Sequence, residues 1–171
     1  MSRHPSQPLH AWVWLGLPMV VCVAATVAFS APLRVFGWGL PEPMFALVLA
    51  FAWAMIRPSI LGPAALLAMG LFYDLFWGGP LGLWGLSLLI AYFTILLARP
   101  LLAGQSVRVL WGWYIAACLL AFSCAYLFMQ FQTGVTPNLT GAALQLAATA
   151  CLYPAAHRLI DRFEDADVRF R

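Results

Sequence analysis

One acidic residue, Asp74, stands inside an apolar stretch, in the run GLFYDLFWGGPLGLWGLS that covers residues 70–87. A carboxylate can act as a general acid or base, bind a cation or accept hydrogen bonds, but inside a membrane it needs a partner group or water. A membrane enzyme needs several polar groups that converge, and an ion pathway needs a chain of them. Asp74 is the only acid or base well inside any apolar stretch of the sequence. The sequence therefore predicts no catalytic residue and a protein that is not an enzyme.

The other polar residues of the sequence do not form a pattern that predicts a catalytic or metal-binding site. Gln130 and Gln145 are the next candidates, and we expect them to form hydrogen bonds between helices, each worth about 1 kcal/mol. The three histidines lie near the N-terminus or at a helix end, away from Asp74. We therefore expect no metal site and no cofactor. The four cysteines lie in apolar stretches without a CxxC spacing and indicate neither a zinc site nor a disulfide framework: Cys22, Cys118, Cys124 and Cys151.

The composition places the chain in a lipid bilayer. Hydrophobic residues make up 64% of the 171 residues and charged residues 9%, against about 45–50% and about 25% in a soluble domain. The net charge of +3 comes from nine arginines and no lysine against six acids. These charges are too few and too scattered for a nucleic-acid surface, so we expect no nucleic-acid partner.

A window of about 19 residues finds six candidate transmembrane helices, which form a single integral membrane domain over residues 1–171. Pro18 interrupts the first, which is tolerated if a neighbour bonds the carbonyl that the proline frees. That apolar run is too long for the core of about 7–15 residues in a cleaved signal peptide, so we expect it to be retained. Gly78-Gly79-Pro80 predicts a tight turn, and Arg99-Pro100 predicts a helix end. The expected spans are 12–30, 43–56, 59–77, 81–98, 109–131 and 139–157, followed by a charged tail at 158–171.

The positions of the arginines predict the orientation, because positive residues gather on the cytoplasmic side. With six spans and a cytoplasmic N-terminus, the outer loops contain Arg34 alone. We therefore expect both termini to be cytoplasmic. The arginines on the inner side are Arg3, Arg57, Arg99, Arg108, Arg158, Arg162, Arg169 and Arg171.

This topology places Asp74 about one turn from the outer end of the third helix. The glycine turn brings the fourth helix back antiparallel, so the unpaired amides at its N-terminus should lie beside the carboxylate. Alternatively, Asp74 faces a partner protein or a substrate at the outer surface. If the carboxylate caps the helix, we expect Asp74→Asn to be mild and Asp74→Leu to be worse. We also expect Gly82→Leu to be harmful if the turn packs closely against a neighbouring backbone.

Small residues recur at intervals of four in the last two helices and predict close helix packing, either inside the protein or against another subunit. A capping role for Asn138 at the start of the sixth helix is expected as well. The two stripes are Ala117, Ala121 and Ala125 in the fifth helix, and Ala143, Ala147, Cys151 and Ala155 in the sixth.

In the region from Arg57 to Phe93, an arginine-proline turn is followed by an apolar helix that ends G-L-x-x-D and by a short G-x-P-L-G turn into another apolar helix. This pattern resembles that of the rod-shape-determining protein MreD family. The preceding PEPMFALVLAFAWAMIRP also fits, except that Glu42 stands where an aspartate is more often expected. The residues that match are Arg57, Pro58, Gly70, Leu71, Asp74, Gly79, Pro80, Leu81 and Gly82.

The resemblance implies a non-enzymatic protein of the bacterial inner (cytoplasmic) membrane that belongs to the cell-elongation machinery for rod shape and peptidoglycan synthesis. Its implied partners are the single-span protein MreC and, through it, MreB, RodA and the transpeptidase of RodA. It also implies an all-α fold related to the substrate-binding (S) components of energy-coupling-factor transporters. That relation supplies the alternative function, a vitamin-type small-molecule binding subunit. The matching residues Asp74, Gly79, Pro80, Gly82, Arg57 and Pro58 are the candidates for a structural or partner-contact role.

Overall fold

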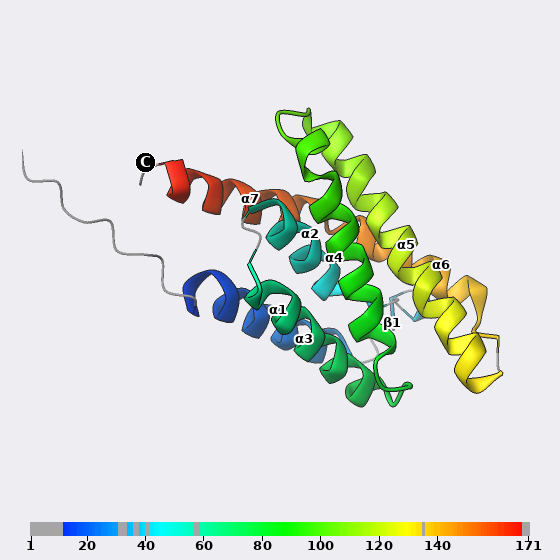
Figure 1. Ribbon diagram of the computed structural model, residues 1–171. Coiled ribbons are helices and arrows are strands. Elements are labelled where there is room, and N and C mark those ends of the chain that lie inside the picture. The colour runs from blue at the N-terminus through cyan, green and yellow to red at the C-terminus, as the bar shows by residue number, and fades with distance from the viewer. Residues whose placement is uncertain are drawn as a thin grey trace, which may run out of the picture.

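The chain folds into packed helices, as a computed structural model of residues 12–30, 34–35, 38–39, 42–56, 59–134 and 136–168 shows (Figure 1). Within these ranges the regular secondary structure is helical apart from two short antiparallel strands, β1 (Arg34–Val35) and β2 (Trp38–Gly39). A π-helix, η1 (Trp12–Gly16), leads into the first α-helix. The α-helices are α1 (Leu17–Phe29), α2 (Phe45–Ile56), α3 (Leu61–Trp77), α4 (Leu83–Leu102), α5 (Val107–Thr133), α6 (Leu139–Ala150) and α7 (Tyr153–Val168).

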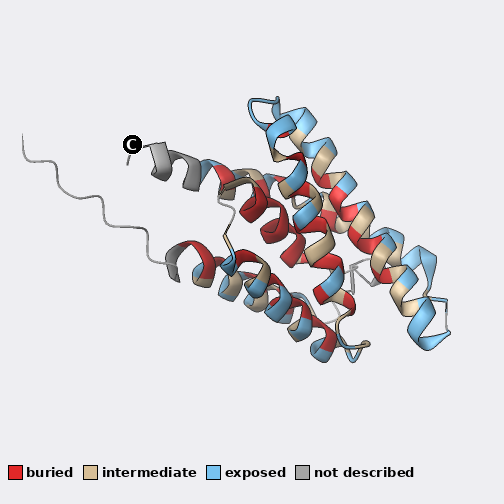
Figure 2. Ribbon diagram, viewed as in Figure 1, coloured by how far each residue is buried: buried red, intermediate tan, exposed pale blue. Residues whose placement is uncertain are grey.

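Helix α2 is the centre of the fold. Every residue from Ala46 to Ala54 is buried, and α2 contacts α1, α3, α4, α5 and α7. Figure 2 shows this helix buried along nearly its whole length, whereas α5 and α6 carry many exposed residues. A helix that is apolar on all sides is expected in such a position. Its 12 residues measure about 18 Å, short of a hydrocarbon core of about 30 Å.

Within the described residues, three helices are long and apolar enough to cross a membrane: α4, α5 and the segment Leu139–Arg162 that contains α6 and the first part of α7. The apolar segments Trp14–Phe29, Phe45–Ile56 and Leu61–Trp77 are shorter. Large apolar side chains are exposed on the outside of the bundle, among them Leu97 (82% exposed) and Phe131 (87% exposed). Such a surface suits lipid rather than water, so the chain is a membrane protein.

Pro18 is accommodated as predicted. A proline in a helix cannot donate to the carbonyl four residues earlier, which is that of Trp14. The indole Nε1 of Trp53, in the buried helix α2, donates to this oxygen at 3.2 Å. A neighbouring helix therefore supplies the hydrogen bond that Pro18 removes.

One expected helix end is wrong, and one expected span is interrupted. Arg99-Pro100 does not end the fourth helix, because α4 continues through Pro100 to Leu102. The predicted sixth span, 139–157, lies within the apolar segment Leu139–Arg162, but the helix is interrupted at Cys151–Leu152, between α6 and α7. Pro154 explains the break, because it cannot donate to the carbonyl of Ala150. That oxygen instead lies 3.5 Å from the indole Nε1 of Trp111, and α7 continues in nearly the direction of α6 (Figure 1).

Candidate functional site

The turn between α3 and α4 contains most of the residues singled out from the sequence. Helix α3 ends at Trp77 and is followed by Gly78, whose left-handed φ of 66° is typical of the residue after the last helical one. Gly82, just before α4, has a φ of 90°, also in a region that favours glycine. Pro80 lies between them, at a position where its missing N–H breaks no helical hydrogen bond. Glycine and proline thus shape a reversal of the chain within a few residues.

Asp74 holds both ends of this turn. Its carboxylate Oδ2 accepts a hydrogen bond from the amide of Gly82 at 2.7 Å, and Oδ1 accepts one from the amide of Trp84 at 2.9 Å. Its main-chain oxygen accepts from the amides of Gly78 and Gly79 at the end of α3. The side chain is buried, with 1% exposed. The prediction that the carboxylate lies beside the N-terminus of the fourth helix is confirmed.

The two helices joined by this turn approach each other unusually closely. A Cβ atom added to Gly70 would lie 2.3 Å from both Cα and N of Gly85, on the facing helix. Real Cβ atoms essentially never come so near to other heavy atoms, and backbone atoms cannot rotate away. Gly70 was singled out only as part of the family pattern, and Gly85 was missed. Glycine within an apolar membrane helix was the available signal, since it often marks a close backbone contact.

The other candidates divide into three cases. Gly79 and Pro80 lie in the turn itself, where the amide of Gly79 donates to the carbonyl of Asp74 at 2.9 Å and the carbonyl of Pro80 accepts from the amide of Leu83 at 3.2 Å. At Gly82 the condition of close backbone packing is not met, because nothing lies within 4 Å of an added Cβ. The conformational strain of its positive φ remains a reason against substitution. Arg57 and Pro58 lie outside the described residues.

Aromatic rings surround the turn on the side of α5. Trp77 stacks on Tyr73, with ring centroids 5.0 Å apart, and meets Trp84 edge-on at 6.0 Å. Trp84 in turn packs edge-on against Phe122 of α5 at 5.4 Å. The indole Nε1 of Trp77 donates to Glu42 Oε2 at 2.9 Å. These contacts tie the segment before α2 to the turn and to α5.

A cavity of about 220 Å³ opens beside these rings, between the turn, α5 and α6. Trp77, Trp84 and Phe122 form its aromatic side, and Tyr126 and Gln145 bring the polar side-chain groups. Gln145 makes no side-chain hydrogen bond in the described structure. It lies partly exposed at this cavity, and the expected hydrogen bond to another helix is wrong. Gln130, which is exposed near the end of α5, makes none either within the described residues.

Two threonines form buried polar links that the sequence analysis missed. Thr149 Oγ1 donates to the carbonyl of Gln145 at 2.7 Å and accepts from the amide of Met44 at 2.9 Å, just before α2 begins. The Thr149 carbonyl accepts from the hydroxyl of Tyr114 at 3.0 Å. Together these bonds join α6, α5 and the start of α2. The only signal in the sequence was a threonine among alanines, shortly before Pro154.

A second threonine joins α1 to α3. The Oγ1 of Thr26 lies 3.0 Å from the hydroxyl of Tyr73 and donates to the carbonyl of Cys22 at 2.9 Å. Both side chains are buried. Like the carboxylate of Asp74, these polar groups are satisfied by the chain itself.

The two small-residue stripes have opposite environments. Ala117, Ala121 and Ala125 of α5 are buried inside the bundle, which fits internal packing. In the second stripe all four residues are exposed: Ala143, Ala147, Cys151 and Ala155. Asn138 caps α6 as predicted, because its side-chain oxygen accepts from the amide of Thr140 at 3.0 Å.

No protein-family model matches this chain, and comparisons with curated protein sequences and with solved structures gave no match. Among the described residues no group of three or more histidine, cysteine, aspartate or glutamate side chains is placed to hold a metal ion.

Proposed function

We propose that this chain is a non-enzymatic scaffold of the bacterial inner membrane that acts with MreC in the cell-elongation machinery, as its resemblance to the MreD family implies. The observation that supports this proposal most is the use of Asp74. Both carboxylate oxygens accept hydrogen bonds from main-chain amides at the end of the turn and the start of α4. The acid of the family pattern therefore has a structural role. MreB, RodA and its transpeptidase are the further partners that this proposal includes.

The proposal includes a topology of six crossings with both termini in the cytoplasm. Helix α2 is too short to cross lipid alone, but its neighbours bury it on all sides. Backbone that is irregular or short at membrane depth is tolerated where protein surrounds it. A reporter fused after Arg171 should indicate the cytoplasm, and one inserted near Gly134 should indicate the outer side. An outer C-terminus would contradict the six crossings.

The exposed stripe along α6 and the start of α7 is the surface we assign to the single-span partner, since small residues allow two membrane helices to pack closely. Ala147→Leu should reduce recovery of the partner when the tagged protein is purified in mild detergent, while the abundance of the protein stays normal. Ala116→Leu, the same change at an exposed position of α5, is the matched control. Equal recovery of the partner with both variants would remove the stripe from the interface, and recovery of no elongation protein with the unaltered chain would refute the function.

The aromatic cavity supports a second candidate, a small-molecule binding subunit related to the S components of vitamin transporters. Its volume of about 220 Å³ is slightly below the roughly 300–1,000 Å³ of most ligand pockets. Purified protein should then be stabilised by one compound in a thermal-shift screen of vitamins, because a ligand at 100 times its dissociation constant adds about 2.7 kcal/mol. Gln145→Leu should abolish that stabilisation. No shift with any compound would favour the scaffold.

A further inference from the structure

A separate groove of about 370 Å³ opens between α1 and α7, with α2 as its floor. Its lining is almost wholly apolar, with Val21 from α1, Leu49 from α2 and Leu159 from α7 as examples. The charged side chain in this lining is that of Arg162. The groove therefore combines an apolar channel with one cation.

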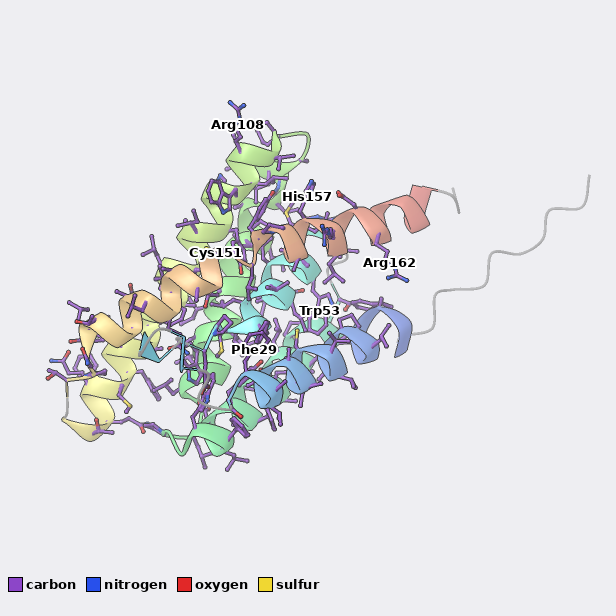
Figure 3. All side chains as sticks on the ribbon, turned by 180° about the vertical axis from the view of Figure 1, so that it is seen from behind. Phe29, Trp53, Arg108, Cys151, His157 and Arg162 are labelled. Atoms are coloured by element: carbon purple, nitrogen blue, oxygen red, sulfur yellow. The ribbon has the colours of Figure 1, made fainter. Side chains whose placement is uncertain are left out.

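The cation at this groove has no counter-ion within the described residues. Arg162 is exposed and makes no ion pair there, and Figure 3 shows it projecting from α7 on the side of α1. The neighbouring acid, Asp161, lies 3.3 Å from Nδ1 of His157 instead. An anion that binds at Arg162 would therefore not displace an existing ion pair of the described chain.

These features identify the class of ligand. A water-soluble ligand would need several fixed polar groups, whereas the lining contributes one charged side chain. A tightly packed membrane helix would favour small residues along the contact, but Val21, Val48, Leu49 and Leu159 of the lining are large. A flexible hydrocarbon chain adapts to such walls, and a guanidinium binds phosphate in a bidentate geometry. Basic pockets between membrane helices bind anionic lipid headgroups in this way.

We propose that the groove between α1, α2 and α7 binds an anionic phospholipid, with one acyl chain along the apolar lining and the phosphate on Arg162. The groove lies apart from the aromatic cavity and shares only Ala155 with the exposed stripe, which runs along α6 into the start of α7. The proposal goes beyond the scaffold function and depends neither on MreC nor on the orientation of the chain. It can be tested with the purified protein alone.

The test compares lipid binding to the delipidated full-length protein in detergent by native mass spectrometry, with phosphatidylglycerol and phosphatidylcholine as the probes. The unaltered protein should bind one phosphatidylglycerol more tightly than phosphatidylcholine. Arg162→Gln should weaken phosphatidylglycerol binding about fivefold, the effect of one arginine near an anionic headgroup. Val21→Trp, a change at a residue that is 58% exposed, should fill the groove and reduce binding of both lipids.

Two controls separate this site from general effects. Arg108→Gln removes an exposed arginine at the start of α5, and Val27→Trp enlarges a residue of α1 that is 49% exposed and outside the lining. Both should bind lipid like the unaltered protein, and elution as a single species should show that each variant is folded. Equal affinity for the two lipids, or an equal loss with Arg108→Gln, would overturn the proposal. The proposal would also be overturned if Val21→Trp left lipid binding unchanged but removed a co-purifying membrane protein. The groove would then bind a helix of that protein rather than a lipid.

Discussion

Asp74 gives the sharpest test of the turn between α3 and α4, because each carboxylate oxygen accepts a different amide. In Asp74→Asn, one oxygen still accepts, but the side-chain NH₂ faces the second amide, and two donors cannot bond. The expectation of a mild effect, drawn from the sequence, therefore needs correction. An unpaired buried amide costs about 1–3 kcal/mol, and the lost charge at the N-terminus of α4 costs about 0.3–1 kcal/mol.

The sum for Asp74→Asn is therefore about 1.3–4 kcal/mol. Asp74→Leu leaves both amides unpaired and should cost about 2–6 kcal/mol from this cause alone. The bonds to Gly82 and Trp84 are partly buried, so water can reach them and the lower halves of these ranges are expected.

The assay is the thermal unfolding midpoint of purified protein in detergent, together with its abundance in membranes. Asp74→Asn should lower the midpoint by about 3 °C or more, and Asp74→Leu by more than Asp74→Asn. Asp161→Asn, at an exposed acid of α7, is the control and should leave the midpoint nearly unchanged. If the midpoint of Asp74→Asn lies within about 1 °C of that of the unaltered protein, the difference is no larger than experimental error. That result would refute the inference that both amides depend on the carboxylate. Normal abundance of Asp74→Leu with reduced recovery of the partner would instead favour a contact role.

Three further substitutions test the packing. Gly70→Ala should lower membrane abundance sharply, because its Cβ would overlap the backbone of Gly85, while Ala68→Gly, at an exposed position of the same helix, should cost only about 1 kcal/mol. Ala121→Leu should destabilise the purified protein by about 1–3 kcal/mol, since Ala121 is fully buried. Ala147→Leu, at an exposed position, should not. Equal unfolding midpoints for the two variants would contradict the difference in burial. Trp53→Phe should cost about 1–3 kcal/mol by leaving the carbonyl freed by Pro18 unpaired, and an unchanged midpoint would show that another group replaces the indole.

Local patterns in the sequence were enough to predict the local structure. The composition indicated a membrane protein, and the glycine-proline turn placed the start of α4 beside Asp74. The capping role of Asn138 and the need to satisfy the carbonyl freed by Pro18 were predicted as well. Each of these depends on residues close in sequence or on a general requirement for hydrogen bonds in a membrane. The family resemblance and the function remain predictions.

The tertiary structure decided which apolar surfaces face inward. In a water-soluble helix the polar residues mark the exposed side, but in a bilayer the lipid-facing side is as apolar as the core. The sequence could therefore not distinguish the buried stripe containing Ala121 from the exposed one containing Ala147. For the same reason it could not show that α2 is enclosed, that Gly70 meets Gly85, or that Thr149 bonds to the start of α2. These contacts join different helices, and only the packing of the helices brings the residues together.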